Sequence, residues 1–238
     1  MIMNLKDKTL FITGANGGVG MTTVLYALKN NAKKIYASAR DTSSLETLAA
    51  ANPSIIPLTL DITDAKSVGD AAGEVDTLDM LINTAGVNTR ARVLEDNILD
   101  FEVNILGNLK VYQAFANRVN EGGAIVTITS ILALVNMPVL GLYSASKSAL
   151  RSIIQALRAE LSPKKVEVYE VLAGPIDTRM TEGQNMPKAK PEAIVTEMFA
   201  GIESKTFEIY PDGFAKSIRE GLLTDPKAVE ADFADSIK

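Results

Sequence analysis

Residues 9–20 read Thr-Leu-Phe-Ile-Thr-Gly-Ala-Asn-Gly-Gly-Val-Gly, an apolar run that passes directly into a glycine-rich turn. The run Thr9–Gly14 has the character of a buried strand, and apolar residues at helical spacing follow in Met21–Asn30. Glycines between a strand and a helix allow a sharp turn and bring backbone N–H groups close to a phosphate at the positive end of the helix. We interpret the segment as a nucleotide-binding turn, with a plain tight turn as the alternative. The turn residues expected to contact the nucleotide are Gly14, Asn16, Gly18, Val19 and Gly20.

The same alternation of a short apolar run and a longer helical segment continues along the chain. Further strands are expected at Lys33–Arg40, Ser54–Leu60, Leu78–Thr84, Gly123–Ser130, Val166–Leu172 and Phe207–Tyr210. Further helices are expected at Ser43–Ala51, Asp64–Ala72, Asp96–Val119 and Tyr143–Leu161. This alternation predicts an α/β fold, a single-domain, Rossmann-like, doubly wound parallel sheet of about seven strands flanked by helices. We expect one domain over residues 1–238, with a substrate lid at about 179–205.

Composition excludes several classes of function. The chain has 238 residues, a formal net charge of −5, no cysteine and no histidine. The charge argues against nucleic-acid binding, and the missing residues exclude thiol chemistry, Ser-His-Asp triads and thiolate- or histidine-ligated metal sites. We expect no metal. The apolar runs are too short to cross a membrane and residues 1–8 are too polar for a signal peptide, so a cytoplasmic location is expected.

Arg40 bears on the choice of nucleotide. It lies just past the second expected strand, where a dinucleotide fold brings the adenosine ribose. An acidic residue there binds the 2′-hydroxyl of NAD, whereas an arginine holds the 2′-phosphate of NADP. The acidic residue here, Asp41, comes one position later. We therefore favour NADP(H) over NAD(H); a solvated arginine at a helix start is the alternative.

Two further strand ends carry acidic or small residues. Asp61 closes the third strand and, because Asp64 suits the cap of the next helix, is free to accept a hydrogen bond from an adenine amino group. A turn aspartate is the alternative. Residues 83–86 close the fourth strand with small side chains that leave space for a ribose and a flat ring, or that form an ordinary short turn.

Ser130, Tyr143 and Lys147 form the most informative group. Ser130 ends the fifth expected strand, and Tyr143 and Lys147, at i and i+4, share one face of the next helix. A lysine ammonium beside a phenol favours the phenolate and lowers its pKa from about 10, so that the phenol can act as a general acid or base without histidine. The Ser130 hydroxyl can orient a carbonyl or alcohol oxygen. A Tyr-x-x-x-Lys pair alone is typical of a solvated helix face, but the strand-end serine and the glycine turn favour catalysis.

Together these motifs make residues 8–178 similar to the short-chain dehydrogenase/reductase family. The matching elements are Thr13-Gly14-x-x-x-Gly18-x-Gly20, Asn83-x-Ala85-Gly86, Asn104, the set Ser130, Tyr143 and Lys147, and Ala173-Gly174-Pro175-Ile176-Asp177-Thr178. Two positions depart from the family pattern: Thr84 replaces the second asparagine of Asn-Asn-Ala-Gly, and Ala173 replaces the proline of Pro-Gly. Both are cofactor-lining positions, so the catalytic groups are intact.

The resemblance implies a role for each matching residue. Tyr143 would be the general acid in carbonyl reduction and the base in alcohol oxidation, with Lys147 lowering its pKa and holding the nicotinamide ribose. Ser130 would fix the substrate oxygen, and Asn104 would hold a water that joins the lysine to solvent as a proton relay. Besides the glycine turn, Arg40, Tyr143 and Lys147, the implied cofactor contacts are Asp61 and Ile62 at the adenine, Asn83, Ala85 and Gly86 at the adenosine-side ribose, and Pro175, Ile176 and Thr178 at the nicotinamide.

The segments expected around the substrate are apolar. Their apolar residues are Ile131, Leu132, Leu134, Val135, Met137, Val139, Leu140, Met180, Met186, Met198 and Phe199. Such a pocket fits a small apolar ketone, aldehyde or alcohol, unless this surface is core or subunit contact. The apolar residues of Asp96–Val119 spread too widely for one buried stripe, and the family usually pairs through such helices, so we expect a homo-oligomer, with a tetramer ahead of a dimer.

The sequence therefore predicts an NADP(H)-dependent oxidoreductase of the carbonyl reductase type, which interconverts a ketone or aldehyde and an alcohol. Two alternatives share the fold. A non-catalytic NADP-binding sensor or regulator need not keep Ser130, Tyr143 and Lys147. A halohydrin-type lyase resembles the family but replaces the lysine with arginine and fills the cofactor turn with bulky residues.

Overall fold

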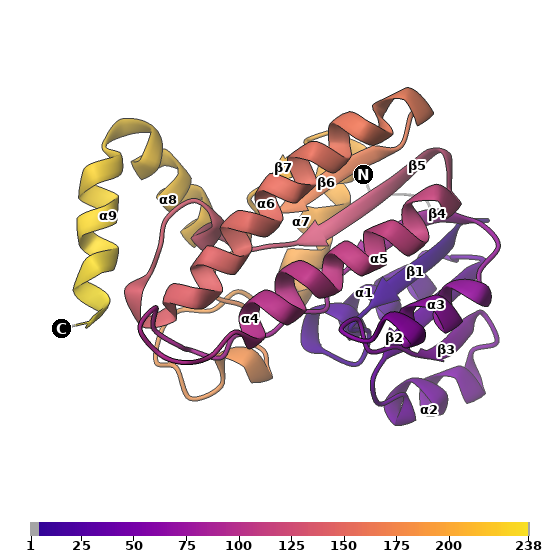
Figure 1. The fold of residues 1–238 in the computed structure, drawn as a ribbon. Coiled ribbons are helices and arrows are strands. Elements are labelled where there is room, and N and C mark those ends of the chain that lie inside the picture. The colour runs from indigo at the N-terminus through magenta and orange to yellow at the C-terminus, as the bar shows by residue number, and fades with distance from the viewer. Residues whose placement is uncertain (1–4, 238) are drawn as a thin grey trace.

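The computed structural model describes residues 5–237, which are built around one sheet (Figure 1). Its strands are β1 (Thr9–Thr13), β2 (Lys34–Ala39), β3 (Ile55–Thr59), β4 (Leu78–Asn83), β5 (Val119–Ile128), β6 (Glu167–Val171) and β7 (Glu208–Ile209). Their order across the sheet is β3-β2-β1-β4-β5-β6-β7, and all six pairings are parallel. The predicted doubly wound parallel sheet is confirmed.

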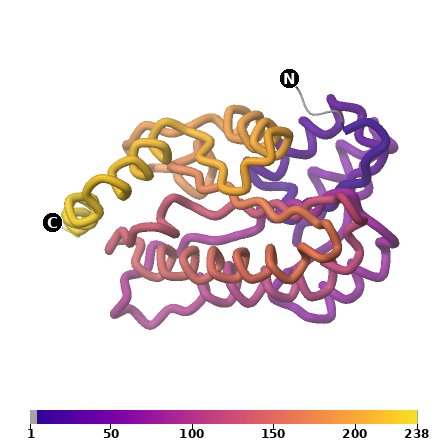
Figure 2. Tube along the Cα trace, turned by 90° about the horizontal axis from the view of Figure 1, so that it is seen from above, coloured from indigo at the N-terminus to yellow at the C-terminus, as the bar shows by residue number. Residues whose placement is uncertain are grey.

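Helices cover both faces of this sheet (Figure 2). The α-helices are α1 (Gly18–Lys29), α2 (Ser43–Ala51), α3 (Ala65–Gly73), α4 (Leu99–Phe101), α5 (Asn108–Phe115), α6 (Gly141–Leu161), α7 (Pro191–Glu203), α8 (Gly213–Thr224) and α9 (Pro226–Ala234). One core lies between the sheet and α1, α2 and α7, and the other lies between the sheet and α3, α5 and α6. Within residues 5–237 no helix is long and apolar enough to cross a membrane.

The alternation of side chains along β1 explains why its sequence is continuously apolar. Leu10 and Ile12 lie in the core shared with α1, whereas Phe11 lies in the core shared with α5. A strand at the centre of a parallel sheet is buried on both faces, so it has no solvent-facing position for a polar residue. At the edge of the sheet β3 pairs only with β2, which is why it tolerates Pro57.

The expected helix Asp96–Val119 is broken into shorter elements. Short α4 passes into a π-helical turn, Glu102–Gly107, and only then into α5, while β5 already begins at Val119. The side-chain amide of Asn108, the first residue of α5, donates to the backbone carbonyl of Asn104 in the π-helical turn, at 3.1 Å. A side chain that takes over a helix carbonyl competes with the regular backbone bond, and this competition is invisible to apolar periodicity.

The expected lid divides into two parts with different surroundings. The second half is mostly α7, whose Met198 and Phe199 are fully buried in the core beside α1. The Phe199 ring stacks on Tyr26, with centroids 4.4 Å apart. The expectation that Met198 and Phe199 line the substrate pocket is therefore wrong, because the apolar face of α7 packs against the sheet. Only residues 179–187 of this segment reach the cavity described below.

The C-terminal helices α8 and α9 were not anticipated from periodicity. They lie at the end of the sheet toward which the β5 arrow points in Figure 1. Their buried residues, Ala215, Val229 and Phe233, pack with the segment that follows β5 and with Tyr143. Helices α8 and α9 thus cover part of the side of the molecule where the strands end.

Candidate active site

One cavity of about 730 Å³ opens at the carboxyl ends of the parallel strands. This is the edge at which open α/β sheets bind their ligands, and the volume is in the range of small-molecule sites. The predicted site residues that line it are Gly14, Asn16, Gly18, Val19, Gly20, Arg40, Asp61, Ile62, Ala85, Gly86, Ser130, Tyr143, Lys147, Pro175, Ile176 and Thr178. Asn83 and Asn104 do not line it.

The glycine turn is shaped by the side chains it lacks. A Cβ added at Gly20 would lie 2.1 Å from the Gly14 carbonyl oxygen, and one at Gly18 would lie 2.5 Å from Cγ2 of Thr178. Gly14 has φ +64°, a conformation that favours glycine. The first residues of α1 line the cavity and no side chain caps this helix, so its N-terminal backbone N–H groups suit the diphosphate of a dinucleotide.

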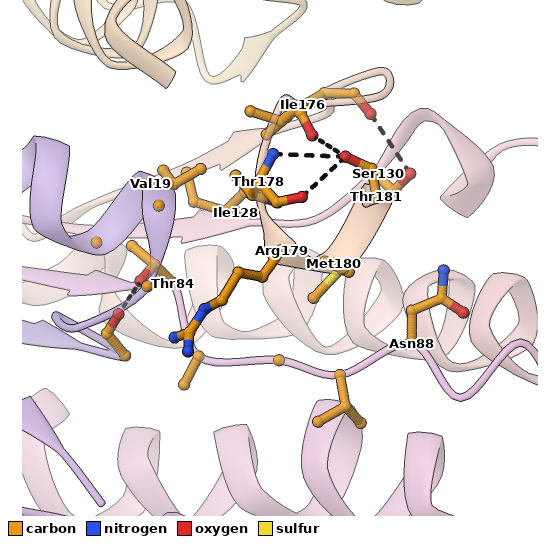
Figure 3. A pocket seen from close by; sticks show the side chains of 18 of the residues that line it. Val19, Thr84, Asn88, Ile128, Ser130, Ile176, Thr178, Arg179, Met180 and Thr181 are labelled. Carbon is orange, nitrogen blue, oxygen red and sulfur yellow. Dashed lines mark hydrogen bonds between the residues drawn. The ribbon is translucent and has the colours of Figure 1, made fainter. Parts of the chain in front are cut away.

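Thr84, one of the two departures from the family motif, braces this turn. Its hydroxyl donates to the Thr13 carbonyl at 2.6 Å. It also donates to the Gly14 carbonyl at 3.4 Å (Figure 3). The threonine therefore ties the end of β4 to the end of β1. Its neighbour Asn83 is 1% exposed and is not among the residues that line the cavity, so a cofactor contact of Asn83 stays a prediction that the cavity lining does not support. Successive side chains of a strand point to opposite sides, and at this strand end Thr84 holds the cavity side.

Two charged residues follow β2: Arg40, and Asp41, whose carboxylate is already hydrogen-bonded. Arg40 is exposed and lines the cavity. The Asp41 carboxylate accepts hydrogen bonds from the Ser43 backbone and hydroxyl, at 3.0 and 2.7 Å, and these bonds lower its pKa. The Asn16 amide donates to the Asp41 carbonyl at 3.0 Å, which joins the glycine turn to this loop. The side chain of Asp41 is thus occupied at the start of α2, whereas the Arg40 side chain lines the cavity.

Asp61 lines the cavity, but its carboxylate is already engaged. The oxygen Oδ1 accepts from the backbone N–H and the hydroxyl of Thr63, at 2.9 and 2.7 Å. These two bonds lower the pKa of Asp61, and the charge of Arg40 lowers it further. Asp61 therefore acts as a turn aspartate, which is the alternative named above. An adenine contact of Asp61 would have to use its second carboxylate oxygen, Oδ2.

The three candidate catalytic groups meet at the wall of the cavity. Ser130 follows β5, and its hydroxyl donates to the Ala173 carbonyl at 3.4 Å (Figure 3). Tyr143 and Lys147 come from the first turns of α6 and are 8% and 4% exposed. The Lys147 ammonium donates to the Ile128 carbonyl at 3.3 Å and lies 5.6 Å from the centroid of the Tyr143 ring.

The pKa of Tyr143 differs from the lowered value that the sequence predicts. Burial raises the pKa of Tyr143 to about 12, against a hydrogen bond from Ser130 that lowers it, and the charge of Asp100 raises it further. Burial also lowers the pKa of Lys147 to about 8, against the charges of Asp100 and Glu170. The expected lowering of the Tyr143 pKa is therefore not found in the protein on its own, because desolvation of the phenol is the largest effect.

Two buried acids near the site were missed at the sequence level. Asp100 is fully buried and accepts hydrogen bonds from the Thr89 hydroxyl and from the Thr89 backbone, the latter at 3.4 Å. Glu170, also fully buried, accepts from the Thr129 hydroxyl at 2.8 Å and forms an ion pair with Arg151. An acid inside an expected apolar strand, as at Glu170, was a usable signal. Asp100 gave none, because a helix of unknown orientation does not reveal which polar residue is buried.

Asn104 is buried beside the site, and its side-chain amide is hydrogen-bonded to other residues of the protein. Its amide accepts from the Val87 N–H and donates to the Val87 carbonyl, both at 2.9 Å, and donates to Ser146 at 3.0 Å. The Ser146 hydroxyl donates to the Tyr143 carbonyl at 2.7 Å. Asn104 thus holds the segment after β4 against the helix that carries Tyr143. A water held by Asn104 stays a prediction.

Part of the cavity wall is apolar. Its apolar side chains are Ile131, Leu132, Met137, Leu140, Met180, Met186 and Phe214. Of the expected residues, Leu134, Val135 and Val139 do not line it. Phe214 was not predicted; it is placed by Asp212, whose carboxylate accepts from Gly174 at 2.8 Å and caps α8 at Ala215 at 2.9 Å.

The segment above the cavity is anchored to its surroundings. The Thr181 hydroxyl donates to the Ile176 carbonyl at 2.5 Å and to the Thr178 carbonyl at 3.2 Å (Figure 3). From the opposite rim the Arg90 guanidinium donates to the carbonyls of Met180 and Glu182, at 3.4 and 3.2 Å. These contacts hold residues 176–182 over the cavity in this conformation.

Comparisons with known proteins agree on one family. The family model for short chain dehydrogenases matches residues 8–189. Carbonyl reductase (NADPH) 2 of Sus scrofa is 31% identical over 178 residues, which cover 72% of each chain. An uncharacterized oxidoreductase of Methylorubrum extorquens is 32% identical over 201 residues, covering 79% of this chain and 81% of that protein. The crystal structure of a short chain dehydrogenase from Burkholderia cenocepacia, in complex with NADP, superposes with a TM-score of 0.91 at 34% identity and covers 97% of this chain and 99% of that one.

Proposed function

We propose that this chain, which belongs to the short-chain dehydrogenase family, is an NADP(H)-dependent oxidoreductase of the carbonyl reductase type. It would interconvert a ketone or aldehyde and an alcohol. The observation that carries the proposal is that Ser130, Tyr143 and Lys147 lie on the wall of the same cavity into which the glycine turn opens. A nicotinamide enzyme needs this juxtaposition of a proton donor, an orienting hydroxyl and a dinucleotide cradle.

The residues around the cavity fit a nicotinamide dinucleotide. The glycine cradle has no room for a Cβ at Gly18 or Gly20, and uncapped N–H groups at the start of α1 suit its diphosphate. Arg40 would hold the 2′-phosphate of NADP, and the commitment of Asp41 to Ser43 supports NADP over NAD. Pro175, Ile176 and Thr178 would lie at the nicotinamide end. When bound, the nicotinamide supplies or accepts the hydride.

The protonation of Tyr143 suits it to donate a proton. With its pKa raised to about 12, the phenol is protonated at neutral pH and can act as the acid when a carbonyl is reduced. The Ser130 hydroxyl would orient the substrate oxygen next to it. In the reverse direction the phenol must lose its proton first, so alcohol oxidation by this site should rise toward alkaline pH. Lys147 lies close to the tyrosine ring, and in its protonated, charged form the lysine would stabilise the phenolate.

The substrate we propose is a small apolar carbonyl compound or the corresponding alcohol. Support comes from Met137, Leu140 and Phe214, apolar side chains that line the same cavity as Ser130. Residues 131–142 contain no charged side chain that would recognise an ionic substrate. Apolar walls with a few converging polar groups are typical of sites that bind such molecules.

Two further properties follow the same proposal. We propose a homo-oligomer, with a tetramer ahead of a dimer, and a cytoplasmic location. Exposed apolar side chains around α4 support subunit contact: Ile98 is 65% and Leu106 is 50% exposed. Mass measured by light scattering would test the oligomer, and a mass equal to one chain would exclude it.

The proposal is tested by NADPH consumption, followed at 340 nm, with a panel of apolar ketones and aldehydes. Wild type should turn over at least one of them, and Tyr143→Phe should lose about 10²- to 10⁴-fold in rate while NADPH still binds. NADPH binding without turnover across the panel would favour the sensor alternative. Wild-type rates in the Tyr143→Phe variant would refute the assigned proton donor.

A second experiment tests the choice of cofactor by binding titration. Arg40→Ala should weaken the binding of NADP far more than the binding of NAD, and equal weakening would contradict the 2′-phosphate contact.

A further inference from the structure

We propose that Arg179 is a binding residue for the diphosphate of the nicotinamide cofactor, which it reaches from the segment that packs on the glycine turn. The inference rests on the proposed function, because it takes the ligand of the turn to be a dinucleotide. It adds a side-chain cation to a site that the motif describes only in terms of backbone groups.

The position of the backbone brings Arg179 to the turn. Its neighbour Thr178 packs directly on Gly18, so closely that a Cβ there would lie 2.5 Å from the threonine methyl. Arg179 therefore starts from a chain segment in contact with the first turn of α1. In Figure 3 its side chain crosses the cavity toward the side lined by Val19 and Thr84. The guanidinium thus points to the region where the turn would hold phosphate oxygens.

The charges around the cavity leave this region without another basic side chain. Residues 13–20 contain no lysine or arginine, so the turn itself offers only N–H groups and the partial charge of the α1 N-terminus. Lys147 donates to the Ile128 carbonyl beside Tyr143, and Arg40 lies past the end of β2. A diphosphate bears negative charge on both phosphoryl groups, and a planar guanidinium matches such oxygens in geometry and charge.

The Arg179 side chain is available for this contact. It is exposed, and within residues 5–237 no hydrogen bond or ion pair engages its guanidinium. Arg90, on the opposite rim, is instead occupied with the carbonyls of Met180 and Glu182. Because those bonds and Thr181 already hold the backbone around Arg179, only its side chain must be ordered when a ligand binds.

Equilibrium binding distinguishes a diphosphate contact from a contact with an anionic substrate. The ligands are NADPH and NADH, which share the diphosphate, and adenosine 2′-monophosphate, which lacks it. Binding is followed by nicotinamide fluorescence, and the monophosphate by competition against NADPH. The variants are Arg179→Ala, Arg179→Lys and Arg40→Ala, with Arg92→Ala as a matched control, since Arg92 is an exposed arginine that does not line the cavity.

We expect Arg179→Ala to raise the Kd of NADPH and of NADH by a similar factor of about 10, as for one charge-assisted hydrogen bond. Arg179→Lys should recover part of this loss, and the affinity for the monophosphate should stay within about twofold. Arg40→Ala should show the converse pattern, weakening NADPH and the monophosphate but not NADH. Arg92→Ala should change nothing.

Unchanged NADPH and NADH affinities in Arg179→Ala, alongside normal binding by wild type, would overturn this inference and leave the proposed function standing. A higher KM for anionic carbonyl substrates with unchanged cofactor affinity would overturn it too, in favour of a substrate contact. Wild type that binds neither NADPH nor NADH would overturn both.

Discussion

Replacing Gly18 by alanine should weaken cofactor binding. Removing the methyl group of Thr178, in a second substitution, should restore part of the lost affinity. The new Cβ would lie 2.5 Å from Cγ2 of Thr178 and 3.1 Å from its Cβ. Carbon atoms pack at about 3.5–4.0 Å, so Thr178 must retreat by roughly 1 Å. Its segment cannot retreat freely, because Thr181 and Arg90 hold it in place. Overpacking of this kind costs about 1–3 kcal/mol.

The expected result is a free energy of unfolding lower by about 1–3 kcal/mol and a Kd for NADPH higher by roughly tenfold or more. Denaturant unfolding and fluorescence titration measure the two quantities. The double variant G18A/T178S removes Cγ2, and the nearest remaining contact relaxes from 2.5 to 3.1 Å. It should therefore recover a substantial part of both losses relative to G18A.

Two neighbouring glycines serve as controls. Gly17→Ala would meet only the Gly14 carbonyl, at 3.3 Å, and should bind NADPH nearly as wild type does. Gly20→Ala would lie 2.1 Å from that carbonyl, a backbone clash that Thr178→Ser cannot relieve. The reasoning is refuted if G18A binds and unfolds like wild type, or if T178S rescues G20A as well as it rescues G18A.

Two further predictions concern the buried acids. Asp100→Asn removes a negative charge that raises the pKa of Tyr143, so the alkaline rise of alcohol oxidation should move to lower pH. Thr89→Val is the control, because it removes a hydroxyl contact of Asp100 but keeps the charge. In this variant the alkaline rise should not move to lower pH. A pH profile of kcat that moves up in Asp100→Asn would contradict this electrostatic role. Glu170→Ala should lower the free energy of unfolding by about 3 kcal/mol, since Arg151 loses its buried partner and keeps only Glu208, at 2.8 Å. Arg151→Met combined with Glu170→Leu should be less destabilised than Glu170→Ala alone, and the reverse order in urea unfolding would count against the ion-pair explanation.

Local signals were sufficient for the order of the elements and for the placement of Tyr143 and Lys147 on one face of α6. All seven expected strands are present, because a strand buried on both faces must be apolar along its length and glycine or polar residues end it. Tyr143 and Lys147 share the buried stripe of α6 as their spacing predicts, because helix geometry relates i to i+4 wherever the helix lies. The glycine turn could be placed for the same reason, since it is bounded by two elements that are adjacent in the chain.

What the sequence by itself could not decide depends on neighbours far away in the chain. The raised pKa of Tyr143 reflects burial and the charge of Asp100, which no spacing rule connects to the tyrosine. Thr84 lines the cavity and contacts Gly14 while Asn83 does not line it, because successive side chains of a strand point to opposite sides. Arg179 reaches the glycine turn because Thr178 packs on Gly18, across 160 residues of chain. Element type is set by short-range sterics and periodicity, whereas desolvation, charge and contact are set by whatever the fold brings close, and those decide how this site works.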